Sequence, residues 1–194
     1  MLSDLNNIER TMNELDTRQF EASVKLLATS RRIYVWGVRT TSAVGDLLSI
    51  ALTYLLGADR VMRLQPTLYH EQLLSAGPED VVIVVSFPRY FRTSVAVAEF
   101  AKERKVPSIA ITDSVLSPIA QKGSLVLCAR SELLSFTESL AAPVSLANAL
   151  VTAVALTRRD QSLASFRKLE KLWSKTRVYH STERRPGSRL PLRA

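Results

Sequence analysis

Short runs of valine and isoleucine alternate along this chain with longer segments whose apolar residues recur at helical spacing. Continuous apolar runs are typical of strands buried on both faces, whereas apolar residues three and four positions apart predict one buried helix face. Strands are expected at 31–36, 60–64, 81–85, 108–112 and 125–128. Because helical segments separate them, the pattern predicts an α/β fold in three layers, with a doubly wound five-stranded parallel sheet in the order 2-1-3-4-5.

The predicted helices lie before, between and after these strands. Asp16 is an expected N-cap with Gln19 three positions later, and Gly57 is expected to end the helix that follows the first strand. Helices are expected near 2–15, 44–55, 68–74, 92–104, 135–159 and 163–173. The domain organisation that follows is two linker or interface helices over 1–30, an α/β domain over 31–174 and a basic irregular tail over 175–194.

Polar side chains gather where the first and third predicted strands end. The segments 37–42 and 86–93 are rich in hydroxyl groups, contain arginine and open a helix. These two strand ends flank the point where strand order reverses, which is where doubly wound sheets bind ligands. Free N–H groups at a helix start favour an anion, although serine and threonine are also common there simply as caps. The candidate ligand-binding residues are Gly37, Arg39, Thr40, Thr41, Ser42, Ser86, Arg89, Tyr90 and Thr93.

Composition narrows the class of protein. Hydrophobic residues make up 46% of the chain and charged residues 23%, which is ordinary for a globular domain. Cys128 is the single cysteine, so an intramolecular disulfide and a cysteine-rich metal site are excluded, and a reducing cytoplasm is the expected compartment. The apolar stretch 140–156 contains Pro143 and polar residues and predicts a buried helix, so no membrane partner is expected. No metal is expected. No nucleotide cofactor is expected either, since the sequence contains neither Gly-x-Gly-x-x-Gly after the first strand nor Gly-x-x-x-x-Gly-Lys.

The net charge of +8 lies entirely in the C-terminal part of the chain. Residues 1–157 carry 15 Lys/Arg against 15 Asp/Glu, and residues 158–194 carry 11 against 3. A basic segment can bind nucleic acid or an anionic membrane because each cation brought to a phosphate releases counterions. A solvated tail with no such partner is the simpler interpretation.

Two stretches carry a more specific resemblance. The sequences YVWGVRTTSAV, from Tyr34, and DVVIVVSFPRYFRTSVAVAEFAKERKVPSIAITDSVLSPIA, from Asp80, resemble the sugar isomerase (SIS) domain. The likeness spans 33–156 and is to the version found in the RpiR/MurR family of bacterial transcriptional regulators. In that family the first loop is often Gly-x-Gly-x-Ser and the second Ser-x-Ser-Gly. Here Arg39 and Thr41 replace the second glycine and the serine, and Pro88 and Arg89 occupy the later positions of the second loop.

The resemblance implies a phosphosugar-binding domain that dimerises and follows an N-terminal helix-turn-helix domain. The expected function is effector sensing in a transcriptional regulator, with a sugar phosphate or sugar acid as effector. DNA would be contacted only through that N-terminal domain, which this sequence lacks, either naturally or by truncation. A homodimer is expected, with a tetramer left open.

Two alternatives to effector sensing remain. A phosphosugar isomerase or lyase of the SIS type would need an acid/base group over the sugar. The candidates for that group are His70, Glu71 and Glu138. A dimerisation module without a ligand is the other alternative. Its interface with a second subunit would consist of the late helix around 144–156 and of apolar residues of the first helices, which are Leu5, Ile8, Met12 and Phe20.

Overall fold

The computed structural model describes residues 1–132 and 138–180. Five parallel strands form one sheet in the order β2-β1-β3-β4-β5, as the sequence predicted. The strands are β1 (Ile33–Gly37), β2 (Val61–Arg63), β3 (Val81–Val85), β4 (Ser108–Thr112) and β5 (Leu125–Cys128). The helices are α1 (Leu2–Glu14), α2 (Thr17–Thr29), α3 (Ser42–Leu56), α4 (Tyr69–Leu73), α5 (Arg92–Glu103), α6 (Ala141–Thr157) and α7 (Arg159–Thr176).

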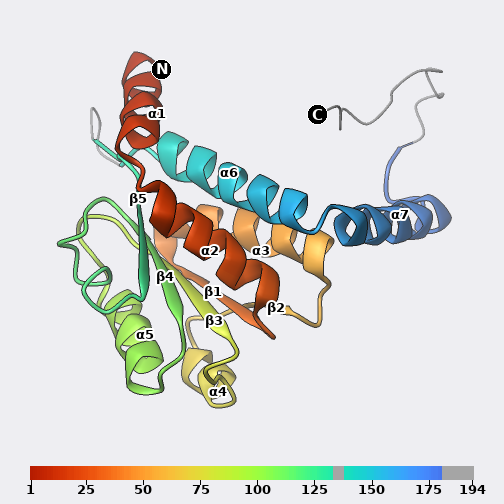
Figure 1. Ribbon diagram of the computed structural model, residues 1–194, viewed down its shortest axis with the longest axis horizontal. Coiled ribbons are helices and arrows are strands. Elements are labelled where there is room, and N and C mark those ends of the chain that lie inside the picture. Colours follow the sequence, from red (N-terminus) through yellow and green to blue (C-terminus); the bar gives the residue numbers. More distant parts are fainter. Residues whose placement is uncertain (133–137, 181–194) are drawn as a thin grey trace.

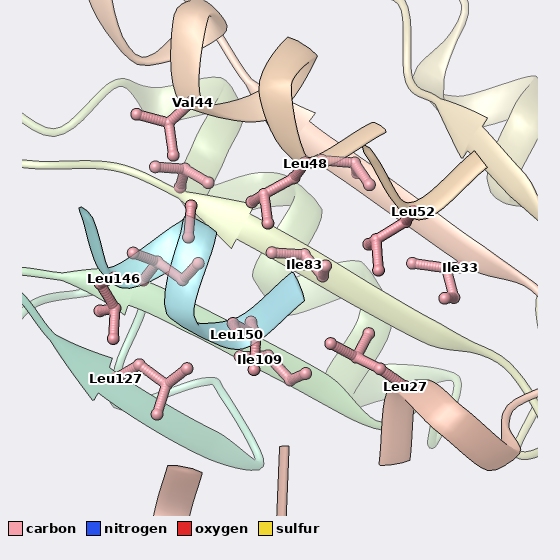
Figure 2. Close-up of a cluster of buried hydrophobic side chains, with 14 of the residues drawn as sticks. Leu27, Ile33, Val44, Leu48, Leu52, Ile83, Ile109, Leu127, Leu146 and Leu150 are labelled. Carbon is pink, nitrogen blue, oxygen red and sulfur yellow. The ribbon is translucent and has the colours of Figure 1, made fainter. Parts of the chain in front are cut away.

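Helices cover both faces of the sheet, which explains why its central strands are buried at every position (Figure 1). On one face, α2, α3 and α6 enclose a cluster that joins Leu27, Leu48 and Leu150 to strand residues such as Ile83 (Figure 2). On the other face, side chains of α4 and α5 pack against Trp36. The Trp36 indole N–H donates to the Ser94 hydroxyl oxygen at 3.0 Å, so its polar group is satisfied within the core.

The start of α2 shows how the N-terminal helices attach to the sheet. The Asp16 carboxylate accepts hydrogen bonds from the backbone N–H groups of Arg18 and Gln19, which confirms the expected N-cap. The Gln19 side chain does not complete a capping box. Its amide oxygen instead accepts a hydrogen bond from the backbone N–H of Val126, at 3.1 Å, and so fastens α2 to the edge strand β5.

The C-terminal helices differ from the sequence prediction at their boundaries. Residues 138–140 are not helical, and α6 begins at Ala141 instead of near Ser135, which lies outside the described residues. Pro143 sits in the first turn of α6, where proline removes no intrahelical hydrogen bond. Helix α7 begins four residues before Leu163, because its first turn is polar and gave no apolar signal. It ends at Thr176, two residues inside the predicted tail, and 181–194 lie outside the described residues.

Helix α7 departs from α6 at an angle of 105° and extends beyond the sheet (Figure 1). It is held on α3 by edge-to-face contacts of Tyr54 with Phe166 and Trp173. In the described part of the chain, no single helix is long and apolar enough to cross a membrane, although α6 and α7 together reach the length and composition of a broken span.

Candidate functional site

The loop after β1 is a tight turn that depends on Gly37. A Cβ atom at this position would lie 2.6 Å from the carbonyl oxygen of Thr41, so only glycine fits. A short 3-10 turn, Arg39–Thr41, then leads into α3. The Thr41 hydroxyl accepts from the N–H of Val38 at 3.1 Å and lies 3.2 Å from the carbonyl oxygen of Val85. Thr41 therefore closes the first loop and ties it to the end of β3.

The loop after β3 is anchored on a neighbouring strand end. Ser86 is 1% exposed, and its hydroxyl has no hydrogen-bond partner among the described residues. The Tyr90 hydroxyl donates to the Asp113 carboxylate, just beyond β4, at 2.7 Å. Burial raises the pKa of Tyr90 strongly and the Asp113 charge raises it further, so the phenol remains a hydrogen-bond donor at any physiological pH.

Each loop carries an arginine in the left-handed backbone region. Arg39 has φ 54° and Arg89 has φ 61°. Such a conformation is unfavourable for any residue except glycine, by roughly 1–2 kcal/mol. The Arg39 guanidinium lies over the Phe91 ring, 5.5 Å from its centroid, and this contact orients the side chain. Lys105 and Arg177, outside the two loops, have the same left-handed conformation, so the backbone alone does not assign a role to the two arginine side chains.

The two loops enclose one cavity of about 340 Å³ at the carboxyl edge of the sheet. Arg39 and Thr40 line it from the first loop, and the second loop and the residues before α6 complete the wall with Pro88, Arg89, Phe91 and Glu138. This volume lies at the lower end of the range for small-molecule sites. The cavity therefore suits a small ligand that presents polar groups to the arginines and an apolar face to the ring of Phe91.

The charges around the cavity leave it electropositive. Glu138 accepts a short hydrogen bond from the Thr40 hydroxyl. That hydrogen bond lowers the pKa of Glu138, burial raises it, and the Arg89 charge lowers it again, so the pKa lies below its ordinary value and the group is charged at neutral pH. Two guanidinium groups thus face one carboxylate. The excess of one positive charge favours an anionic ligand.

Only part of the predicted site lines this cavity. Arg39, Thr40 and Arg89 do, whereas Thr41 and Ser86 are buried and are not among the lining residues. The Thr41 hydroxyl bonds within its own loop, and the Ser86 hydroxyl has no partner among the described residues. None of the other predicted residues is among the described residues that line it. The Ser42 hydroxyl donates to the Arg39 carbonyl oxygen at 2.6 Å, and Thr93 is exposed in the first turn of α5.

Two lining residues, Pro88 and Phe91, were not among the predicted ligand-binding residues. The sequence signal was present, since both lie inside the loop that follows β3. Of the three acid/base candidates, Glu138 lines the cavity, while His70 and Glu71 are exposed on α4 and do not. The structure therefore does not bring these three residues together.

Comparison with known proteins agrees with this fold. The SIS domain family matches residues 26–153. An uncharacterised HTH-type transcriptional regulator of Haemophilus influenzae is 30% identical over 128 residues. The match covers 63% of this chain and 42% of that protein, so the chain spans less than half the length of this relative.

Two solved structures extend the likeness. The sugar isomerase domain of the RpiR transcription factor of Sphaerobacter thermophilus superposes with a TM-score of 0.82 at 29% identity, covering 88% of this chain and 95% of that one. The Vibrio vulnificus NanR protein complexed with ManNAc-6P has a TM-score of 0.77 at 18% identity, covering 90% and 67%. Together with the family match, these likenesses show that the chain belongs to the SIS domain family and is similar to SIS domains found in transcriptional regulators.

Proposed function

We propose that this chain is the effector-sensing domain of a transcriptional regulator. It binds a sugar phosphate, or another anionic carbohydrate derivative, in the cavity between the Gly37 and Ser86 loops. Binding controls the attachment of a separate helix-turn-helix domain to DNA. The observation that carries the proposal is that arginines from both loops converge on one cavity at the point where the strand order reverses.

The cavity walls match the chemistry of such a ligand. Guanidinium groups form paired hydrogen bonds to phosphate or carboxylate oxygens, which Arg39 and Arg89 supply from opposite loops. The Thr40 hydroxyl provides a group that binds sugar hydroxyls. The Phe91 ring offers a flat apolar surface for the C–H face of a sugar ring. NanR, whose structure holds ManNAc-6P, has the same fold, which supports a ligand of this class.

Binding without turnover fits the site better than isomerisation does. Moving a proton between two sugar carbons requires an acid/base group placed over those carbons. Glu138 is the only one of the three candidates on the cavity, and its lowered pKa makes it a weak base. Its carboxylate is also engaged by Thr40.

A thermal-shift screen tests the proposal directly. The panel contains sugar phosphates, ManNAc-6P among them, sugar acids, and the matching neutral sugars as controls. A ligand at a hundred times its Kd is expected to raise the melting temperature by about 5–10 °C, while its neutral counterpart leaves it unchanged. If no anionic member raises it, or if the chain converts one of them into product, the sensing function is wrong.

The exposed apolar side of α1 supports the dimer that the proposal includes. Leu5 is 62% exposed and Met12 68% exposed, and they lie on one side of the helix. The wild-type chain is expected to elute as a dimer, and the double substitution Leu5→Ser with Met12→Ser to elute as a monomer, measured by size-exclusion chromatography with light scattering. The matched control is Leu68→Ser with Leu74→Ser, two exposed leucines beside α4 on the opposite side of the sheet (Figure 1). A monomeric wild type, or a dimer that survives both changes in α1, would contradict this arrangement.

A further inference from the structure

The side of α1 that faces the rest of the protein is polar. Hydrogen bonds or ion pairs join this side to Arg130 and Glu132, just after β5, and to Ser139, just before α6. The residues of α1 that make them are Asp4, Asn7, Arg10, Thr11 and Glu14. Asn7 is fully buried, and its side-chain oxygen has no partner among the described residues. Polar groups such as these can exchange hydrogen-bond partners. The attachment of α1 can therefore change while Leu5 and Met12 stay on its exposed side.

Two of these contacts lie on either side of Glu138 in the sequence. The Ser139 hydroxyl donates to the Asp4 carboxylate at 2.6 Å. The Asn7 amide donates to the carbonyl oxygen of Glu132 at 3.4 Å, and the Glu132 carboxylate pairs with Arg10. Helix α1 is therefore bonded directly to the residue that follows Glu138.

Glu138 carries the one negative charge among the described residues that line the cavity. Its carboxylate accepts the hydrogen bond of Thr40 and lies close enough to Arg89 for that charge to lower its pKa. An anionic ligand that binds Arg89 and Thr40 competes for the same partners and repels the carboxylate. We therefore expect the Glu138 carboxylate to move when an anion occupies the cavity.

We propose that an anionic effector displaces the Glu138 carboxylate from Thr40 and that the displacement, passed to Ser139, loosens the hydrogen bond between Ser139 and Asp4 of α1. This regulation rests on the proposed function of the cavity. It makes α1 the element that reports occupancy of the cavity, because Asp4 of this helix is hydrogen-bonded to Ser139, the residue after Glu138. The ligand-bound and ligand-free states of the cavity then differ in how firmly α1 is attached. A DNA-binding domain coupled to α1 can respond to that difference.

Hydrogen exchange of the full chain, followed by mass spectrometry, tests this link without a ligand. Glu138→Ala is expected to speed exchange of the amides of α1 about fivefold, the change that losing one hydrogen bond of ordinary strength produces. Ser139→Ala is expected to do the same, while α2 is unchanged in both. The matched control is Glu99→Ala, in the middle of α5, which breaks a partly exposed ion pair between Glu99 and Lys122. It is expected to leave the exchange rates of the α1 amides as in wild type.

A second arm adds ManNAc-6P, with inorganic phosphate as the minimal anion, to the wild-type chain. Faster exchange in α1 with either probe supports the link. A ligand that raises the melting temperature while α1 exchanges as before overturns the link and retains the binding function. Glu138→Ala with unchanged exchange in α1 also overturns it. If no ligand binds but Glu138→Ala loosens α1, the link is supported and the proposed function fails.

Discussion

Replacing Asp80 with alanine is expected to lower the free energy of unfolding by about 3 kcal/mol at pH 7. The carboxylate is fully buried at the start of β3, where it accepts hydrogen bonds from the Arg31 guanidinium at 2.7 and 2.9 Å and from the Gly77 N–H at 2.9 Å. These bonds hold together the entry to β1 and the entry to β3, the two strands whose far ends carry the cavity. Removing the carboxylate leaves the Gly77 N–H and the Arg31 guanidinium without their hydrogen-bond acceptor.

Chemical denaturation of wild type and Asp80→Ala measures this loss. The matched control is Asp46→Ala, which removes an exposed carboxylate paired with Arg63 and is expected to change stability by less than about 1 kcal/mol. Equal losses in the two variants would show that burial of the Asp80 carboxylate adds nothing to its contribution to stability.

Acid should remove the difference between wild type and Asp80→Ala. Burial by itself raises the pKa of Asp80, but the hydrogen bonds from Arg31 and Gly77 outweigh it and hold the pKa below its ordinary value. The stabilisation is therefore fully present above the unfolded pKa of about 3.9 and is lost as the pH falls through the lower folded value. A difference in stability that persists well below that range would contradict this account.

The central strands of the sheet could be predicted from the sequence because they are buried on both faces. β3 and β4 have the predicted bounds, since short runs rich in valine and isoleucine are typical of such strands, and the partly buried edge strand β5 has them as well. Helix ends were less predictable where the local signal is weak. The first turn of α7 is polar, and the position of Pro143 in the first turn of α6 depends on packing against the sheet, which helical spacing does not encode.

The candidate site was predictable in place but not in detail. Both loops meet at the carboxyl edge, as the doubly wound order requires. A hydroxyl that follows a strand, however, can turn toward a ligand or back toward the chain, and spacing does not distinguish the two. Thr41 turns back to cap its own loop, and Ser86 is buried with its hydroxyl unpaired among the described residues. For Phe91 the only signal was its position in the loop after β3, because its residue type resembles that of a core residue.

Replacing both cavity arginines with glycine is expected to weaken effector binding by at least about a hundredfold without lowering stability. Each guanidinium lost removes a charge-assisted hydrogen bond to the anion, and each such bond is worth about tenfold or more in affinity. Arg39 and Arg89 both have left-handed backbone conformations that glycine adopts freely. Relief of that strain offsets the greater freedom of glycine in the unfolded chain, so the free energy of unfolding stays the same or rises by about 1 kcal/mol per site.

Lys105→Gly is the matched control for this double variant. Lys105 has φ 57°, close to the values at both arginines, but it lies after α5 and does not line the cavity. It should show the same backbone effect on denaturation with no change in ligand affinity measured by calorimetry. If Arg39→Gly with Arg89→Gly binds the effector as wild type does, the arginines are not its anchor and the cavity has another use. A loss of stability at these two sites but not at Lys105 would mean that the arginine side chains stabilise the fold, and the argument from their strained backbone would fail.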